Sequence, residues 1–359
     1  MMNENRMRVL MVGPDRSVHG GISGVVNNYY DAGLNRMIDL CYIGTMVEGT
    51  KFRKLLQAVK AYICFLSKLP HYDIAHINMA SDSSYFRKSV FIRTAKLCRK
   101  KVVIHQHGGN FPEFYEQELS ERGRQRVRKI LSMGDAFLVL GTAWMDFFGA
   151  IIGKERITVL PNAIRLPEQK KKQYGVRKIL YMGRLCKAKG IGELLTIMPE
   201  LKAHYPDIRL YLAGIWEDAE LKTQAGALKD YVVDLGWIGG TQKQQYLEEC
   251  DIFVLPSYFE GQPVSVLEAM ANACGIVTTK TGSIPDMIIE GDTGMFAVPK
   301  DAKTLEQSLS KLLADSELCR MLGENARRKA EAEFSIDNNI KKLLAVYKTI
   351  SCKEPHHEK

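Results

Sequence analysis

The chain has 359 residues, of which 46% are hydrophobic and 25% charged, a composition typical of soluble globular proteins. This length exceeds what one hydrophobic core usually serves, so we expect two domains. Eight scattered cysteines without a CxxC pair argue against a disulfide framework and a metal cluster. No stretch approaches the roughly 20 apolar residues that span a bilayer. We therefore expect a cytoplasmic protein, peripheral at most to the inner face of the cell membrane.

The net charge of +9 is concentrated in one part of the chain. Residues 1–165 hold 24 Lys and Arg against 14 Asp and Glu, whereas residues 166–359 hold 26 against 27. Within the first half, residues 51–129 hold 17 against 6, an excess of 11. A concentrated basic region implies an anionic partner such as nucleic acid, a membrane or a phosphorylated substrate.

The first half alternates short apolar runs with helical patterns, which predicts a parallel sheet with helices on both faces. The predicted strands are 7–13, 38–43, 73–78, 101–106, 135–140 and 157–160. The predicted helices are 22–34, 52–69, 83–99, 114–132 and 142–151. Residues 163–176 contain Pro167, a lysine run and Gly175, which favours an interdomain linker.

The same pattern then restarts, so we expect two α/β domains of Rossmann-like build. The second set of predicted strands is 177–182, 208–213, 231–235, 252–255, 276–279 and 294–298. The helices between them are 190–203, 241–249, 264–273, 284–290 and 301–313. Residues 337–350 form a further amphipathic helix.

Glycines cluster where the first predicted strand leads into a helix, in the run from His19 to Gly24. Glycine at such a turn lets backbone amides approach a phosphate at the helix N-terminus. The GxGxxG spacing of dinucleotide-binding folds is absent. Taken alone, the motif favours the simpler interpretation, a tight turn that needs positive φ.

The basic region contains helix-forming stretches with two interpretations. In residues 52–69 the cations accompany a broad apolar face, which suits an anionic membrane surface. Arg122, Arg124, Arg126 and Arg128 instead surround their helix. Helices packed on the sheet with solvated cations explain any single stretch equally well. Nucleic acid is disfavoured because no binding motif or aromatic platform accompanies the charge.

Two histidines close the fourth predicted strand. His105 belongs to the strand by its position, and His107 falls at the carboxyl end, before a glycine pair. A lone histidine is more often a core or surface residue. The position of His107, at the edge where open sheets place their sites, favours a functional role.

In the second half, Arg184 ends the first predicted strand and Lys189 precedes the next helix. Both could reach one anionic group, since Arg offers a fixed fork of donors and Lys a compact charge. The alternative is a pair of solvated surface cations.

Glu260 and Glu268 bracket the most informative stretch, PSYFEGQPVSVLEAMA, at residues 256–271. It follows a buried strand and enters a helix, so both acids can face the crevice at the carboxyl end of that strand. Carboxylates there suit a ligand rich in hydroxyl groups. A glycosidase pair is disfavoured because the two acids lie side by side on one loop and helix rather than flanking a bond.

Together these residues resemble the retaining glycosyltransferases of family four (glycosyl transferases group 1), which have the GT-B fold. EGQPVSVLEAMA resembles the E-x7-E signature of the family, and nearly the whole chain is covered. The supporting matches are MGRL with Lys189-Gly190, Leu160-Pro161-Asn162, Leu212-Ala213-Gly214, and Gly282-Ser283-Ile284-Pro285-Asp286 running to Asp292-Thr293-Gly294. The match at GGI and HQHG in the first half is looser.

The resemblance implies two Rossmann-like domains facing across a cleft. Residues 1–165 with the C-terminal helix 336–352 would bind the acceptor, and residues 166–335 the nucleotide-sugar donor. The implied catalytic residues are Glu260, His107, Arg184 and Lys189. The implied donor-binding residues are Gly21, Arg184, Lys189, Glu260, Gly261, Gln262, Val264, Ser265 and Glu268. No metal or other cofactor is expected, because the two cations would do the work of a divalent ion.

Among these residues the resemblance assigns Glu268 to the ribose, Glu260 to the transferred sugar, and the cations to the diphosphate. Gln262 stands where the family often has an apolar residue, so we connect it with donor choice. The implied reaction moves a hexose or N-acetylhexosamine to a growing, lipid-diphosphate-linked glycan in surface polysaccharide synthesis, with an anionic membrane contacting residues 51–129. The alternatives are a sugar-nucleotide 2-epimerase of the same fold and a non-catalytic, membrane-docked subunit of glycan assembly.

Overall fold

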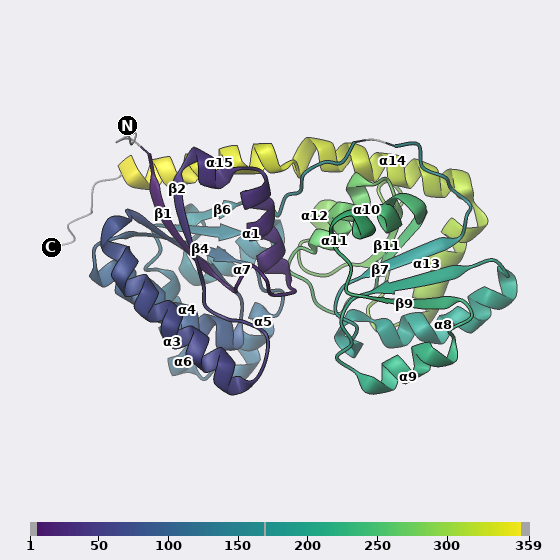
Figure 1. Cartoon of the computed structure of the whole chain (residues 1–359), viewed down its shortest axis with the longest axis horizontal. Helices are drawn as coiled ribbons and strands as arrows, with labels where there is room; N and C mark the ends of the chain where they lie inside the picture. The colour runs from purple at the N-terminus through teal and green to yellow at the C-terminus, as the bar shows by residue number, and fades with distance from the viewer. Residues whose placement is uncertain (1–5, 169, 353–359) are drawn as a thin grey trace. The chain divides into compact units, whose positions relative to one another are not determined.

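The structure is a computed structural model that describes residues 6–168 and 170–352. The chain forms two compact units (Figure 1). Unit 1 consists of Met1–Arg165 and Ile336–Lys359, and unit 2 of Leu166–Ser335. Each unit holds a six-stranded sheet in which every described strand pair is parallel. Parallel neighbours need crossover connections, and helices provide them in both units.

In unit 1 the strand order is β2-β1-β3-β4-β5-β6. The strands are β1 (Arg8–Gly13), β2 (Asp39–Gly44), β3 (Ile74–Met79), β4 (Lys101–Gln106), β5 (Ala136–Val139) and β6 (Ile157–Val159). The helices are α1 (Gly21–Asp31), α2 (Leu34–Met37), α3 (Lys51–Lys68), α4 (Asp82–Leu97), α5 (Phe111–Glu113), α6 (Glu121–Leu131), α7 (Thr142–Ile152) and α15 (Ile336–Cys352).

In unit 2 the order is β12-β11-β10-β7-β8-β9. The strands are β7 (Lys178–Met182), β8 (Arg209–Ala213), β9 (Val232–Gly236), β10 (Ile252–Leu255), β11 (Gly275–Thr279) and β12 (Met295–Ala297). The helices are the 3-10 turn η4 (Lys187–Lys189), α8 (Ile191–His204), α9 (Ala219–Ala227), α10 (Gly240–Glu249), α11 (Val264–Ala271), α12 (Ile284–Met287), α13 (Ala302–Ala314) and α14 (Ser316–Glu333).

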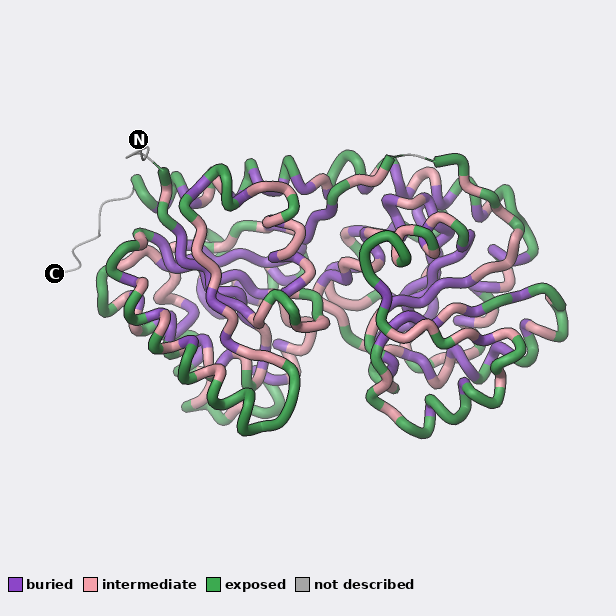
Figure 2. The backbone as a smooth tube through the Cα atoms, in the orientation of Figure 1, coloured by how far each residue is buried: buried purple, intermediate pink, exposed green. Residues whose placement is uncertain are grey.

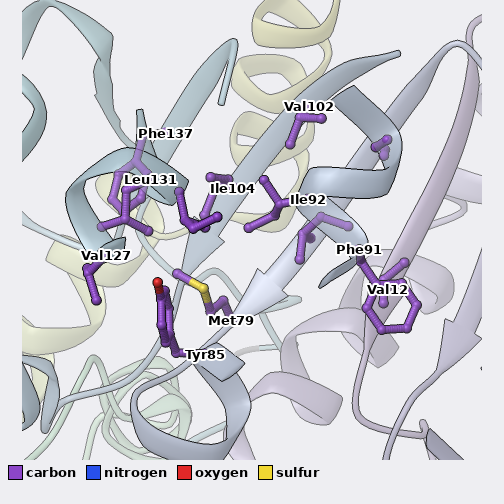
Figure 3. Close-up of a cluster of buried hydrophobic side chains, with 14 of the residues drawn as sticks. Val12, Met79, Tyr85, Phe91, Ile92, Val102, Ile104, Val127, Leu131 and Phe137 are labelled. Carbon is purple, nitrogen blue, oxygen red and sulfur yellow. The ribbon is translucent and has the colours of Figure 1, made fainter. Parts of the chain in front are cut away.

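The central strands are buried on both faces, which explains why their sequences are mainly apolar rather than alternating between apolar and polar residues. Every residue of β3, β5 and β10 is buried, and Figure 2 shows buried segments in the interior of each unit. In unit 1, side chains from the sheet meet those of α4 and α6. Figure 3 shows this cluster around Ile104, Ile92 and Leu131.

The C-terminal helix α15 is part of the interior of unit 1. Its Tyr347 hydroxyl lies 2.7 Å from Nδ1 of His76 on β3, and both residues are fully buried. The Tyr29 hydroxyl of α1 donates to Oδ1 of Asn339 at 2.8 Å. The Ile336 amide donates to the carbonyl of Ile164 at 3.0 Å. Unit 1 is therefore built from both ends of the chain.

The predicted fold class is confirmed, because both halves are parallel α/β sheets of Rossmann-like build. One predicted helix is wrong: residues 114–132 do not form a single helix. A π-turn (Phe114–Glu118) is followed by extended backbone at Leu119, and α6 begins after Ser120, whose hydroxyl accepts from the Gly123 amide. Helices α9 and α14 were not predicted from the sequence. Across residues 6–168 and 170–352, no helix is long and apolar enough to cross a membrane.

Helix α14 packs so closely on its neighbours that it should tolerate only glycine at position 323. A Cβ on Gly323 would lie 2.2 Å from the carbonyl oxygen of Ala273. We expect Gly323→Ala to lower the free energy of unfolding by about 1–3 kcal/mol. Gly226 in α9 is the matched control, because no atom lies within 4 Å of its added Cβ. Gly226→Ala should raise stability by about 0.5–1 kcal/mol. Urea unfolding followed by circular dichroism measures both, and equal stability of Gly323→Ala and the wild type would contradict this packing.

Candidate functional site

The strand order of unit 2 creates a crevice position at the carboxyl ends of β7 and β10. From β7 the chain proceeds outward through β8 and β9, whereas from β10 it proceeds in the opposite direction through β11 and β12. Strands β7 and β10 are nevertheless neighbours. In open α/β sheets, ligands bind where the order reverses in this way, outside the carboxyl ends of the strands.

Four of the residues singled out by sequence follow these two strands. Arg184 comes two residues after β7, and Lys189 closes the turn η4. Glu260 lies in the loop after β10, and Glu268 lies in α11. The Tyr258 amide donates to the carbonyl of Ala188 at 3.0 Å, which joins the two loops. The structure therefore brings all four to one edge of one sheet.

Lys189 and Glu260 form the most enclosed ion pair of this edge. Lys189 Nζ lies 2.5 Å from Glu260 Oε1, and only 16% and 10% of the two side chains are exposed. Partial burial strengthens their mutual attraction but also makes either charge costly to leave alone. An anion that takes Lys189 as a partner must therefore be matched by hydrogen-bond donors for Glu260, and hydroxyl groups fit that need.

The backbone of Arg184 is fixed by a hydrogen bond, whereas its guanidinium group is exposed. The buried Tyr181 hydroxyl donates to the Arg184 carbonyl at 2.8 Å. Burial raises the pKa of Tyr181 well above its ordinary value, so this hydroxyl keeps its proton. The Arg184 side chain is 57% exposed, and its Nη1 lies 3.2 Å from Glu217 Oε2. Its guanidinium can therefore accept a second anionic partner from solvent.

Glu268 is paired with a cation that the sequence did not indicate. Lys243 of α10 places its Nζ 2.5 Å from Glu268 Oε1, and the Glu268 side chain is 19% exposed. Around the carboxyl ends of β7 and β10, each of three acids thus has its own cation. No group of three His, Cys, Asp or Glu able to hold a metal ion occurs within the described ranges 6–168 and 170–352.

The loop that carries Glu260 is held by close backbone packing. Gly282 has φ +54°, and a Cβ there would lie 2.0 Å from the carbonyl oxygen of Glu260. The Ser283 amide donates to the Gly261 carbonyl at 2.8 Å. The Gln262 side chain is buried. This packing gives the loop one conformation and explains why glycine is required at position 282.

The loop ends at the first turn of α11, which begins at Val264. The N–H groups of Val264 and Ser265 lie in that turn, where a helix offers them no internal acceptor. Such N–H groups, with the helix dipole, favour negatively charged or oxygen-rich ligands.

In unit 1, His107 comes directly after β4, and the prediction that His105 belongs to that strand is confirmed. His107 Nε2 lies 2.9 Å from Oδ1 of Asn78, whose own Nδ2 donates to the Val12 carbonyl. His107 is therefore the donor in its pair, which leaves Nδ1 as an acceptor. Burial and, secondarily, the electrostatic influence of the nearby His76 ring lower the pKa of His107 to about 3. The ring is neutral at physiological pH.

The tight-turn interpretation of the first glycine cluster is wrong. Gly20 is extended, with φ −172°, and neither Gly21 nor Gly24 has positive φ. Gly21 is exposed at the first position of α1, and no atom lies within 4 Å of a Cβ added there. The missing side chains leave the start of this helix open instead of bending the chain.

Three partners of the predicted residues were missed: Lys243, Glu217 and Asn78. Lys243 lies in an ordinary polar helix, and nothing in its local sequence marks it. Glu217 carried a usable signal, since it follows β8, the strand beside β7. Asn78 was concealed inside an apolar run, where a buried amide side chain needs a partner.

Comparison with known proteins shows which family unit 2 is similar to. Residues 163–329 match the family Glycosyl transferases group 1. The matched residues comprise most of unit 2. One relative is the N,N'-diacetylbacillosaminyl-diphospho-undecaprenol alpha-1,3-N-acetylgalactosaminyltransferase of Campylobacter jejuni, 43% identical over 96 residues, which are 27% of this chain and 25% of the relative. The chain spans about half the length of the first curated relatives it matches.

Solved structures resemble the chain over nearly its whole length. The sucrose-phosphate synthase of Thermosynechococcus elongatus has a TM-score of 0.79 at 19% identity, covering 96% of this chain and 99% of its own. The HepE protein of Anabaena, solved with UDP-glucose, has a TM-score of 0.75 at 15% identity, covering 96% and 100%. This likeness concerns the fold. The chain has the GT-B fold of two Rossmann-like domains.

The packing of Gly282 should determine the conformation of the Glu260 loop. Gly282→Ala carries the penalty of positive φ, about 1–2 kcal/mol, and adds a steric clash that displaces the loop. We expect faster hydrogen exchange of the amides of residues 258–262 and a larger loss of stability than in Gly291→Ala. Gly291 is the matched control, since it has φ +73° but open space around its Cβ. Equal effects of the two substitutions would show that the clash does not control the loop.

Proposed function

We propose that the protein is a retaining, metal-independent glycosyltransferase that uses a nucleotide-diphosphate sugar as its donor. It moves a hexose or N-acetylhexosamine to a growing, lipid-diphosphate-linked glycan in the synthesis of a surface polysaccharide. The observation that carries the proposal is the set of three acid–cation pairs at the strand-order reversal of unit 2. That site lies within the region that matches Glycosyl transferases group 1.

The two cations after β7 suit the diphosphate. Binding phosphate oxygens between Lys189 and Arg184 would exchange their present carboxylate partners for a ligand of the same sign. Arg184 supplies a planar fork of donors and Lys189 a compact charge. As the bond from the sugar to the diphosphate breaks, both cations stabilise the charge that develops on the leaving group.

Glu260, which this exchange releases from Lys189, and Glu268 suit hydroxyl groups. Glu268, now beside Lys243, would accept hydrogen bonds from the ribose. Glu260 would accept them from the transferred sugar, with the amides of Gly261 and Gln262 and of the first turn of α11 nearby. Gln262 and the buried contacts of its loop are the positions that we connect with the choice of sugar.

Retention follows from front-side attack. The acceptor hydroxyl oxygen forms its bond to the anomeric carbon on the face from which the diphosphate departs. Its proton passes to a departing phosphate oxygen. Neutral His107 contributes a hydrogen-bonding ring rather than a proton, because its pKa of about 3 is far below physiological pH. Rate acceleration then rests on positioning and on stabilisation of the leaving group.

The proposed acceptor class is based on similarity to a relative rather than on the geometry of the site. The name of the Campylobacter jejuni relative describes transfer to a sugar linked through diphosphate to undecaprenol. A lipid-diphosphate acceptor is accordingly our proposal for this chain. An epimerase of the same fold would instead convert the donor without any acceptor, so the products distinguish the two activities.

The test is a screen of nucleotide sugars by thermal shift, followed by turnover with a lipid-diphosphate glycan acceptor and analysis of the product. We expect a new glycosidic bond of retained anomeric configuration and undiminished turnover in excess EDTA. A strict requirement for a divalent metal or an inverted product would contradict the mechanism. An epimerised sugar nucleotide formed in the absence of acceptor would replace the proposed activity with epimerisation.

Lys189 and the neighbouring Lys187 form a matched pair for testing the leaving-group role. Lys187 is 67% exposed and pairs with Glu220 at 3.4 Å, whereas Lys189 is enclosed beside Glu260. We expect Lys189→Ala to lower kcat by about 10²–10³-fold, and Lys187→Ala to leave it within about twofold of wild type. Thermal unfolding checks that both variants are folded. Equal kcat values for the two variants would remove Lys189 from the chemistry.

A further inference from the structure

Large apolar side chains are exposed on two adjacent helices of unit 1. Of sixteen such exposed residues in the described part of the chain, nine lie on α3 and α4. They are Phe52, Leu55, Leu56, Val59, Ile63 and Leu66 on α3, and Phe86, Val90 and Leu97 on α4. We call these nine residues the α3–α4 face. A cluster of this size on a protein surface is unusual and marks a site of interaction.

Helix α3 has two apolar sides, of which only one meets the protein. Ala61 and Phe65 are buried against the rest of unit 1. At 3.6 residues per turn, the six exposed residues fall within an arc of about 100° on another side of the helix. Phe52 is 76% exposed and Ile63 is 62% exposed. The packing of unit 1 therefore does not account for this second stripe.

The exposed residues of α4 continue the same surface. Positions 86, 90 and 97 also share one side of their helix. The helices are held side by side, because the Tyr62 hydroxyl lies 2.8 Å from Thr94 Oγ1 and the rings of Phe65 and Phe91 pack edge to face. Figure 1 shows α3 and α4 next to each other along one side of unit 1.

Cations outnumber acids on the two helices that form the apolar face. Helix α3 contains five Lys and Arg and no Asp or Glu. Lys51, Arg53 and Lys60 are exposed, and Asp82 is the single acid of α4. Helix α6 differs: its exposed positions are polar or charged, and its apolar residues Val127, Ile130 and Leu131 are buried. The basic region 51–129 thus contains one amphipathic surface, and α6 is not part of it.

We propose that the α3–α4 face docks on an anionic lipid bilayer. The apolar stripe of α3 would enter the boundary between headgroups and acyl chains, while Lys51, Arg53 and Lys60 contact lipid phosphates. A helix with a charged side and an apolar side lies in the plane of such an interface, and attraction to anionic lipid adds to its binding. The proposal concerns unit 1 and stands independently of the donor site.

A second copy of the chain fits this surface less well. A two-fold dimer would place the α3–α4 face against itself, because both partners use the same patch. The cations of one copy would then meet those of the other, with no acid on α3 to neutralise them. An anionic bilayer removes this repulsion, and it also covers the apolar residues.

The test measures binding of the full chain to phosphatidylcholine vesicles with and without phosphatidylglycerol, at low and high salt, without sugar nucleotide. We expect binding that needs phosphatidylglycerol and weakens as salt rises. Replacing Lys51, Arg53 and Lys60 with Gln should weaken binding by about 100-fold, at about fivefold per cation. Replacing Leu55, Leu56 and Ile63 with Gln should weaken it at least about tenfold.

The control replaces three exposed apolar residues of unit 2 with Gln: Ile289, Val298 and Met321. It should bind like the wild type. A Leu55→Trp variant keeps the stripe apolar, and its fluorescence should shift to the blue on anionic vesicles. Vesicle binding equally weakened by the control would overturn the proposal. The proposal would also be overturned if the protein were a dimer that does not bind vesicles and that becomes a monomer when Leu55, Leu56 and Ile63 are replaced with Gln. A monomer that fails to bind anionic vesicles even at low salt would overturn it as well. Because no donor is used, failure of the proposed transfer activity cannot mimic these outcomes.

Discussion

The reversal of strand order between β7 and β10 is the constraint on which the site depends. Because these neighbouring strands are parallel, the loops after them lie at one edge of the sheet, and because the chain leaves the strands in opposite directions, those loops diverge and leave a crevice position between them. Close backbone contacts at Gly190 and Gly282 then hold those loops in place. The side chains of Lys189 and Glu260, 71 positions apart in sequence, meet at 2.5 Å as a result.

The two units handle charge differently. At the site edge of unit 2, Glu217, Glu260 and Glu268 are each paired with a cation, so a ligand that carries phosphate and hydroxyl groups can replace these partners without leaving a buried charge alone. Unit 1 brings together His76 on β3, His105 on β4 and His107 directly after β4. Burial lowers the pKa of each, so this cluster is neutral. One unit offers exchangeable charges, and the other offers fixed, uncharged hydrogen-bonding groups.

The sequence was informative where strong local patterns decide the structure. Apolar runs located the strands within a residue or two, because strands buried on both faces leave little ambiguity. The prediction of one helix over 114–132 was wrong because Ser120 caps the start of a new helix, although the surrounding sequence has a continuous helical pattern. In the site, Arg184, Lys189, Glu260 and Glu268 were found because they follow strand ends. Their partners Glu217 and Lys243 come from separate elements, and only the folded topology brings them close.

The inclusion of α15 in unit 1 has a consequence for how the chain folds during synthesis. Unit 2 is one continuous segment, so its whole sequence is available before the last helix is made. Unit 1 lacks Tyr347 and Asn339 until then, and the buried side chains of His76 and Tyr29 have no α15 partner. On a ribosome, where domains generally form as they emerge, unit 1 is therefore completed only after unit 2 has been synthesised.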